Sequence, residues 1–350
     1  MDRQHTILLP NSHWATNVGN AFFSLGVNYV LQQAAVNSRI IQTAQLSTIN
    51  VLSFKNLVRK NDLEYIKYSE PDWFMLCGPL FVEYVLKAYD RVLEKIFENN
   101  SKTKLIIMNA GSVLYDKNEY ELSKRFLEKY HPTVLISRDT ETYERYGKFA
   151  DFSYCGFDTA FFCPDYYKPF DVPKLQEYVT FCFDRGYEPR IDLNGFDKNY
   201  PATYPNVKIH NPKIFKKHYR LWKYLNILHR FPREIEGKLV IRPNQEVLRE
   251  SDLIIFWKPN AFISQTPYAY LNLYSDTNLT VADKVHACVA TLAFGNPARL
   301  ISRTKRRYLF KRLGAETIDQ EIVKLDLDNL EKEKRNYLDF VKKVYKEIVG

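Results

Sequence analysis

The chain has 350 residues, of which 45% are hydrophobic and 26% charged; this is typical of a globular protein and long enough for two domains. The amino end lacks the apolar core of a secretion signal, and no stretch approaches the roughly 18 apolar residues of a membrane span. The formal net charge of +9 favours an anionic partner, namely a phosphorylated substrate, an anionic membrane surface or nucleic acid.

Several chemistries lack their usual sequence signals. The five cysteines are irregularly spaced within apolar runs, without a Cys-x-x-Cys pair, so we expect buried free thiols in a reducing cytoplasm and no zinc. Dinucleotide, P-loop, Gly-x-Ser-x-Gly and His-Glu-x-x-His motifs are absent, and so is a clustered carboxylate metal site. Nucleic-acid binding would rest on charge alone, so we expect no nucleic-acid partner.

Strands and helices alternate through the first half of the chain. Apolar strands are predicted at 6–10, 72–79, 103–112 and 133–139. Helices with apolar residues at helical spacing are predicted at 21–34, 81–99, 118–130 and 140–148. This alternation predicts a mostly parallel sheet with helices on both faces.

A polar, proline-containing segment then predicts a linker at 166–175. A second α/β series follows it. Its predicted elements are strands at 178–185, 238–244 and 252–257, a basic amphipathic helix at 213–231, and a charged helix near the carboxyl end. We therefore expect one domain at 1–165 and another at 176–350, with the last helix counted in the second.

The most informative stretch is 274–314. It predicts a short strand end from Tyr274, a turn at Asp283–His286, a helix of small apolar residues, a stop at Gly295–Pro297 and a strand at 299–302. A lysine and a histidine at the start of a helix lie where backbone N–H groups and the helix dipole favour an anion. Seven basic and no acidic residues then lie between Ala298 and Arg312. This pattern indicates an anion site at the carboxyl end of a strand.

Several of these motifs resemble the polysaccharide pyruvyl transferase family. Lys284-Val285-His286, the small-residue helix, Phe294–Pro297 and Lys305 are similar to that family's Arg-Leu-His-Ala, apolar helix, Gly-x-Pro and later lysine. Further landmarks follow the family's order, namely Asn17-Val18-Gly19-Asn20, Gly111-Ser112, Ser137-Arg138-Asp139 and Cys155-Gly156-Phe157-Asp158. The resemblance covers roughly Ile7 to Gly314 and implies two Rossmann-like domains facing a cleft, a glycosyltransferase-B-like fold.

The resemblance also implies roles for individual residues. His286 is the expected general acid/base, and the expected donor-binding residues are Arg185, Lys284, Lys305 and Arg303. Lysine at 284 replaces the family's arginine and offers a point charge instead of a bidentate fork. The expected acceptor side of the cleft comprises Asn17, Gly19, Asn20, Gly111, Ser112 and Asp158. Structural alternatives stay open: a surface arginine for Arg185, a helix cap for Asp158, and mainly structural pairing for Arg138 and Asp139.

The implied activity is transfer of a pyruvyl group from phosphoenolpyruvate to a sugar of a cell-surface polysaccharide or its lipid-linked precursor, forming a ketal. Phosphoenolpyruvate is a co-substrate, and we expect neither cofactor nor metal. The expected location is the cytoplasm, and the basic run leaves open peripheral contact with an anionic membrane at its inner face. Two alternatives stay open, a nucleotide-sugar-dependent glycosyltransferase of the same fold and a non-catalytic glycan-binding protein.

Overall fold

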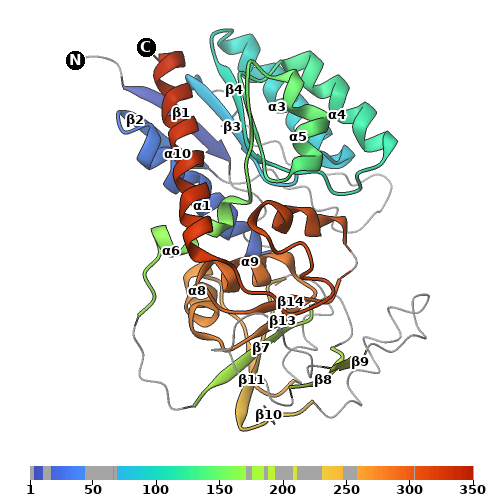
Figure 1. Cartoon of the computed structure of the whole chain (residues 1–350). Helices are drawn as coiled ribbons and strands as arrows, with labels where there is room; N and C mark the ends of the chain where they lie inside the picture. The colour runs from blue at the N-terminus through green and yellow to red at the C-terminus, as the bar shows by residue number, and fades with distance from the viewer. Residues whose placement is uncertain are drawn as a thin grey trace. The chain divides into compact units, whose positions relative to one another are not determined.

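A computed structural model describes residues 4–10, 17–43, 66, 69–170, 176–184, 188–193, 208–210, 231–246, 258–302 and 304–349. Contacts divide the chain into two compact units, each of which has its own sheet (Figure 1). Unit 1 comprises Met1–Trp14, Phe23–Thr159 and Glu331–Gly350. Unit 2 comprises Ala15–Phe22 and Ala160–Leu330.

The sheet of unit 1 has six parallel strands in the order β2-β1-β3-β4-β5-β6. Its strands are β1 (His5–Pro10), β2 (Ser38–Thr43), β3 (Trp73–Cys77), β4 (Lys104–Ala110), β5 (Val134–Ser137) and β6 (Phe152–Cys155). The inner strands β3, β4 and β5 are almost entirely buried, which explains their continuous apolar sequences. The edge strands β2 and β6 were not predicted, because they are only partly buried and carry polar residues.

The helices of unit 1 pack through apolar stripes. They are α1 (Gly19–Ala34, of which residues 23–34 belong here), α3 (Glu83–Asn99), α4 (Lys117–Tyr130), α5 (Thr140–Tyr146) and the short η1 (Gly147–Phe149). Figure 1 shows α3, α4 and α5 beside β3 and β4, and buried residues of α3 and α4 share one core cluster with these strands. Asp116 accepts a hydrogen bond from the Glu119 backbone N–H at 2.8 Å and so caps α4.

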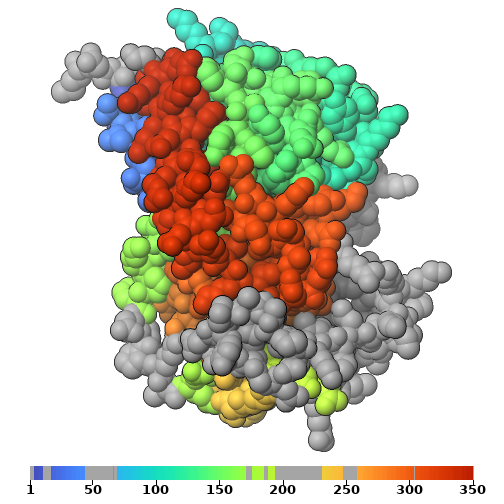
Figure 2. All heavy atoms as spheres, viewed as in Figure 1, coloured from blue at the N-terminus to red at the C-terminus, as the bar shows by residue number. Residues whose placement is uncertain are grey.

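The C-terminal helix α10 (Leu327–Val349) belongs mainly to unit 1, contrary to its expected place in the second domain. The fully buried Tyr337 lies edge-on to Phe157, with ring centroids 5.4 Å apart. Nearer the end of α10, the hydroxyl group of Tyr345 lies 2.6 Å from Oγ of Ser38. The apolar stripe of α10 thus covers unit 1, while Figure 2 shows its outer side at the molecular surface.

The main sheet of unit 2 has the order β10-β11-β7-β13-β14, and β12 also pairs with β11. Its strands are β7 (Tyr178–Cys182), β10 (Glu234–Ile235), β11 (Lys238–Pro243), β12 (Ala261–Phe262), β13 (Thr280–Ala282) and β14 (Ala298–Leu300). All pairs are parallel except β10 with β11. A separate antiparallel pair is formed by β8 (Arg190–Asp192) and β9 (Lys208–His210).

The helical elements of unit 2 surround this sheet. They include η2 (Thr159–Phe162, from residue 160), α6 (Cys163–Tyr166), α8 (Pro267–Asp276), α9 (Val285–Ala293) and η5 (Lys305–Leu313). The short strand end predicted before the turn at Asp283 is confirmed as β13, whereas Tyr274, at the start of that stretch, lies in α8 and is fully buried there. The basic run forms the 3-10 helix η5, which buries Leu309, Phe310 and Leu313 and leaves Lys305 exposed.

The structure confirms the α/β prediction, with a parallel sheet in unit 1 and a mostly parallel sheet in unit 2. Residues 171–175 of the predicted linker, the strand predicted at 252–257 and nearly all of the helix predicted at 213–231 lie outside the described residues. The shared cleft stays a prediction. All five cysteines are free thiols, and four of them are buried. Among the described helices, none is long and apolar enough to cross a lipid bilayer.

Substituting Tyr337 by alanine is expected to lower the free energy of unfolding by about 3–5 kcal/mol, because a large, fully buried ring is removed from the packing of α10 on unit 1. Urea unfolding followed by circular dichroism measures this change. Tyr84→Ala on α3 is the control, since Tyr84 is 60% exposed. Equal losses in both variants would contradict the packing assigned to α10.

Candidate functional site

Three parallel strands of unit 2 end side by side, because β7 lies between β11 and β13. Asp184 follows β7, Gln245 and Glu246 follow β11, and Lys284 follows β13. Ligands of parallel α/β sheets bind at such carboxyl ends. This edge of the sheet is therefore the candidate functional site.

Lys284 lies between two carboxylates at this edge. Its Nζ is 2.7 Å from Oε1 of Glu246 and 3.7 Å from Oδ2 of Asp184. All three side chains are at least nine-tenths buried. The predicted donor-binding lysine is thus ion-paired, and its charge is compensated within the protein.

Asp184 also holds the loop that follows β11. Its Oδ2 accepts hydrogen bonds from the backbone N–H groups of Gln245 at 2.8 Å and Glu246 at 3.2 Å. Burial raises the pKa of Asp184 from 3.8 to about 6, opposed chiefly by the positive charge of Lys284 and supported by the negative charge of Asp283. Asp184 therefore changes its charge near neutral pH while it fixes the loop.

His286 is the second residue of α9, the helix that begins directly after Lys284. Small buried residues fill this helix, including Ala287, Cys288 and Ala290. The hydroxyl group of Thr291, also on α9, lies 2.6 Å from that of Thr280 on β13. The helix therefore packs closely on its own strand, and this packing places the half-buried His286 at the edge of the sheet.

The loop before α1 lies against the same edge. The backbone N–H of Val18 donates to the carbonyl group of Gln245 at 2.9 Å, and Oδ1 of Asn17 accepts from the Gly19 N–H at 3.1 Å. A methyl group at Gly19 would lie 2.7 Å from Oε1 of Gln245 and 3.1 Å from Cβ of His286. A larger residue at this position would therefore force the Gln245 side chain, and to a smaller extent His286, to shift.

The structure thus brings the Asn17–Asn20 segment together with the Lys284–His286 segment, although they lie near opposite ends of the chain. Asn17, Gly19 and Asn20 were expected on the acceptor side, in the first domain. They belong instead to unit 2, which also contains Lys284 and His286. The reason is the hydrogen bond from Val18 to Gln245, which attaches this loop to the end of β11.

The other predicted acceptor-side residues gather in unit 1 around the buried Arg138. Its Nη1 donates to Oδ2 of the fully buried Asp158 at 3.4 Å. A methyl group at Gly111 would lie 2.1 Å from Nε of Arg138, and the backbone N–H of Ser112 donates to Oγ1 of Thr142 at 3.2 Å. In the described residues Asp158 pairs with Arg138, and its predicted roles on the acceptor side or as a helix cap stay predictions.

Asp139 likewise has the structural role expected of it. Its Oδ1 accepts from the Thr142 backbone N–H at 2.7 Å at the start of α5, and its Oδ2 accepts from the Tyr115 hydroxyl group at 2.9 Å. Lys305 is exposed at the start of η5, and its donor-binding role stays a prediction. Arg185 and Arg303 lie outside the described residues, so their donor-binding roles stay predictions.

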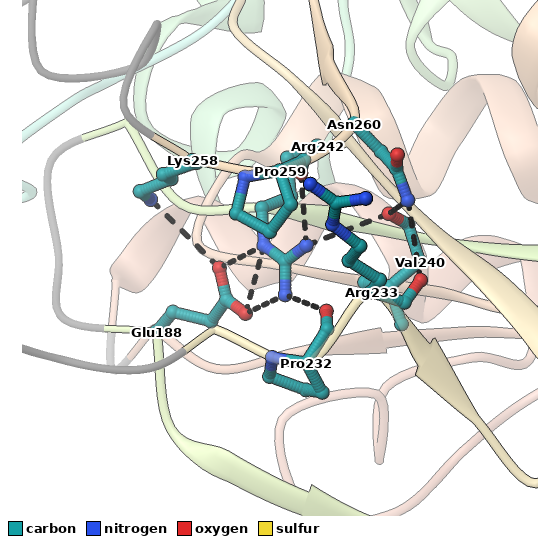
Figure 3. Close-up of polar contacts among 8 residues, drawn as sticks. All are labelled: Glu188, Pro232, Arg233, Val240, Arg242, Lys258, Pro259 and Asn260. Carbon is teal, nitrogen blue, oxygen red and sulfur yellow. Dashed lines mark hydrogen bonds and ion pairs between the residues drawn. The ribbon is translucent and has the colours of Figure 1, made fainter.

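A second buried charge cluster, formed by Glu188, Arg242 and Lys258, joins the chain after β7 to β11 (Figure 3). Arg242 donates from Nε and Nη2 to both carboxylate oxygens of Glu188 at 2.8–3.1 Å. It also donates to the carbonyl groups of Pro232 and Pro259. Nζ of Lys258 lies 3.8 Å from Oε2 of Glu188. The cluster fixes the loops that flank the candidate site.

Sequence reasoning did not identify Asp184, Gln245 or Glu246. Asp184 lies at the end of the strand predicted at 178–185, and Gln245 and Glu246 follow the strand predicted at 238–244, so position at a strand end was an available signal. No local sequence pattern links Asp184 to its ion-pair partner Lys284, because the two residues are 100 residues apart. Within the described residues, no group of three or more His, Cys, Asp or Glu side chains has the arrangement of a metal site.

A protein-family model described as polysaccharide pyruvyl transferase matches residues 17–305. No curated protein sequence matches the chain significantly.

Solved structures share the fold at low identity. Staphylococcus aureus MnaA, in a co-structure with UDP, is 10% identical with a TM-score of 0.56, covering 97% of this chain and 90% of its own. A UDP-N-acetylglucosamine 2-epimerase from Rickettsia bellii is 12% identical with a TM-score of 0.52, covering 99% and 96%.

A putative enzyme of the same description from Listeria monocytogenes is 10% identical with a TM-score of 0.51, covering 98% of this chain and 91% of its own. These similarities confirm the glycosyltransferase-B-like fold class. They concern the fold alone, because the identities are far too low to carry over substrates or residue roles.

Substituting Glu188 by alanine is expected to cost about 3–5 kcal/mol of unfolding free energy, because Arg242 and Lys258 would lose their buried counter-charge. Glu98→Ala is the matched control. Glu98 is 65% exposed and pairs with Lys95 at 3.1 Å, so it should cost only about 0–1 kcal/mol. Chemical denaturation of both variants measures the difference, and a loss below about 1 kcal/mol for Glu188→Ala would refute the role given to the cluster.

Substituting Gly19 by alanine is expected to displace the side chain of Gln245, which donates to the Tyr274 hydroxyl group at 2.9 Å, and to shift His286. Overpacking of this kind costs about 1–3 kcal/mol. Thermal unfolding measures the cost, and the loss of ligand-induced stabilisation reports damage to the site. Gln33→Ala, at an exposed position of the same helix, should change neither quantity.

Proposed function

We propose that this protein, which belongs to the polysaccharide pyruvyl transferase family, transfers a pyruvyl group from phosphoenolpyruvate to a sugar of a cell-surface polysaccharide or its precursor. The product is a pyruvate ketal, and inorganic phosphate is released. The observation that carries the proposal is the meeting of Lys284, His286 and the Asn17–Gly19 loop at one edge of the unit 2 sheet.

The reaction needs one proton transfer to carbon and two bonds from sugar oxygens. One sugar hydroxyl group bonds to C2 of phosphoenolpyruvate while the methylene carbon C3 takes up a proton and becomes a methyl group. A second hydroxyl group then bonds to C2 and the phosphate leaves with its electron pair. The protons of the two hydroxyl groups account for the new C–H bond and the proton released with phosphate.

His286 fits the role of the acid/base group, because a histidine exchanges protons near neutral pH. It lies at the start of α9, where backbone N–H groups and the helix dipole favour a bound anion. Lys284 attracts the anionic donor electrostatically, to the extent that its charge is not already neutralised by Asp184 and Glu246. Arg185, Arg303 and Lys305 are proposed as further contacts to the donor's phosphate and carboxylate groups.

A second candidate is a nucleotide-sugar-dependent glycosyltransferase. It is favoured by the UDP bound to the structurally similar MnaA. A helix N-terminus beside a lysine would suit a diphosphate as well as a phosphate monoester. The two candidates differ in the donor, so donor binding separates them.

We expect phosphoenolpyruvate to raise the melting temperature of the protein and UDP-sugars to leave it unchanged, because only a ligand of the folded state stabilises it. His286→Ala should keep this stabilisation while phosphate release with a panel of glycan acceptors falls at least about 100-fold, the usual contribution of an acid/base group.

Stabilisation by UDP-sugars alone would favour the second candidate. Stabilisation by neither ligand would favour a glycan-binding protein without catalysis. Undiminished phosphate release by His286→Ala would remove this histidine from the proposed chemistry.

A further inference from the structure

The candidate donor site holds more acidic than basic charge among the described residues. Two buried carboxylates, Asp184 and Glu246, face the one ammonium group of Lys284. Asp283 adds a further negative charge beside Lys284 in the sequence and acts electrostatically on Asp184. Among the described groups around Lys284, carboxylates thus outnumber the ammonium group.

Every element packed around Asp184 contributes to this balance. Lys284 and Asp283 follow β13, Glu246 follows β11, and Cys182 ends β7 with its thiol 3.8 Å from Oδ1 of Asp184. The hydroxyl groups of Tyr270 and Tyr274, both on α8, also interact electrostatically with Asp184. The burial that surrounds Asp184 raises the pKa of these tyrosines and of Cys182 too, so they stay neutral near pH 7. In the described part of the chain, Lys284 is the cation that contacts Asp184.

An anionic donor at Lys284 would add negative charge next to two buried carboxylates. Like charges at short range in a buried site raise each other's pKa and favour the protonated form of one carboxyl group. Asp184 is the group suited to take that proton. Its Oδ2 can keep the hydrogen bonds from the Gln245 and Glu246 backbone N–H groups as a neutral carboxyl oxygen, with the proton on Oδ1.

We propose that Asp184 is a positioning residue that couples the binding of an anionic donor at Lys284 to the uptake of one proton. The proton comes from solvent and ends on the Asp184 carboxyl group. Lys284 then faces one carboxylate, Glu246, and shares its charge with the donor. The donor's identity as phosphoenolpyruvate rests on the proposed function, whereas the coupling itself applies to any anion bound at Lys284.

The size of the effect follows from the fraction of protein that is ready to bind. With a pKa of about 6, roughly 3% of Asp184 is protonated at pH 7.5 and roughly three quarters at pH 5.5. If only the protonated form binds the anion well, affinity falls by up to about 25-fold between these pH values. Asp184→Asn resembles the protonated form, so it should bind the anion well at both.

The test is isothermal titration of the full chain with phosphoenolpyruvate and, separately, with inorganic sulfate, at pH 5.5 and 7.5. Sulfate serves as an anion whose own charge is constant across this range, whereas a phosphate monoester titrates near pH 6. Repeating the titrations in buffers of different ionisation enthalpy gives the number of protons taken up. Asp328→Asn is the control, because it makes the same chemical change at an exposed position of unit 2.

At pH 7.5 we expect Asp184→Asn to bind either anion up to about 30-fold more tightly than the unaltered protein, and to take up close to one proton fewer. Asp328→Asn should match the unaltered protein in both respects. A purely structural role for Asp184 would instead weaken binding at both pH values and leave proton uptake unchanged, and that result would overturn the proposal.

The two anions separate this proposal from the proposed function. Sulfate binding with the expected proton difference supports the coupling even when phosphoenolpyruvate does not bind, a result that counts against phosphoenolpyruvate as the donor. Failure of both anions to bind overturns the coupling. Should Asp184→Asn not fold, Glu246→Gln removes the other carboxylate facing Lys284. It should also reduce proton uptake at pH 7.5, and an unchanged uptake would overturn the proposal.

Discussion

The ion pair between Lys284 and Glu246, 2.7 Å long, joins the ends of β13 and β11 across the intervening strand β7. Asp184 completes this arrangement from β7 itself, because it approaches Lys284 and accepts the backbone N–H groups of Gln245 and Glu246. The positions of the other site groups depend on these contacts. The loop that contains Gly19 is attached through Gln245, and α9 with His286 begins directly after Lys284.

Two buried acidic residues after β7 therefore have related tasks. Glu188 neutralises the guanidinium group of Arg242 and fixes the chain next to β11, in a pair that is saturated with hydrogen bonds. Asp184 holds the following loop through backbone N–H groups and keeps a longer contact of 3.7 Å to Lys284. The fully hydrogen-bonded pair of Arg242 and Glu188 stabilises one arrangement of the chain. The longer contact of Asp184 allows Lys284 to interact with a bound ligand as well as with the protein.

Much of the fold could be predicted from the sequence, because the inner strands and the long helices have strong patterns. The strands β3 and β4 are buried on both faces, so their sequences are continuously apolar, and α3 places its buried residues at helical spacing. The edge strands β2 and β6 escaped prediction because partial burial allows a mixed sequence. The unit to which α10 belongs could not be predicted, because its apolar stripe fits any complementary surface and only packing selects one.

For the candidate site, the local sequence is enough to place a lysine and a histidine at a strand-to-helix turn, followed by residues small enough to pack on a sheet. The groups that surround them follow from the packing of remote segments. Asp184, Glu246 and Gly19 are distant from Lys284 in the chain, and no local pattern marks them as its neighbours. The physical reason is that a parallel sheet brings together the ends of strands from remote segments. The charge balance of the site then depends on burial and distance, which a linear pattern does not contain.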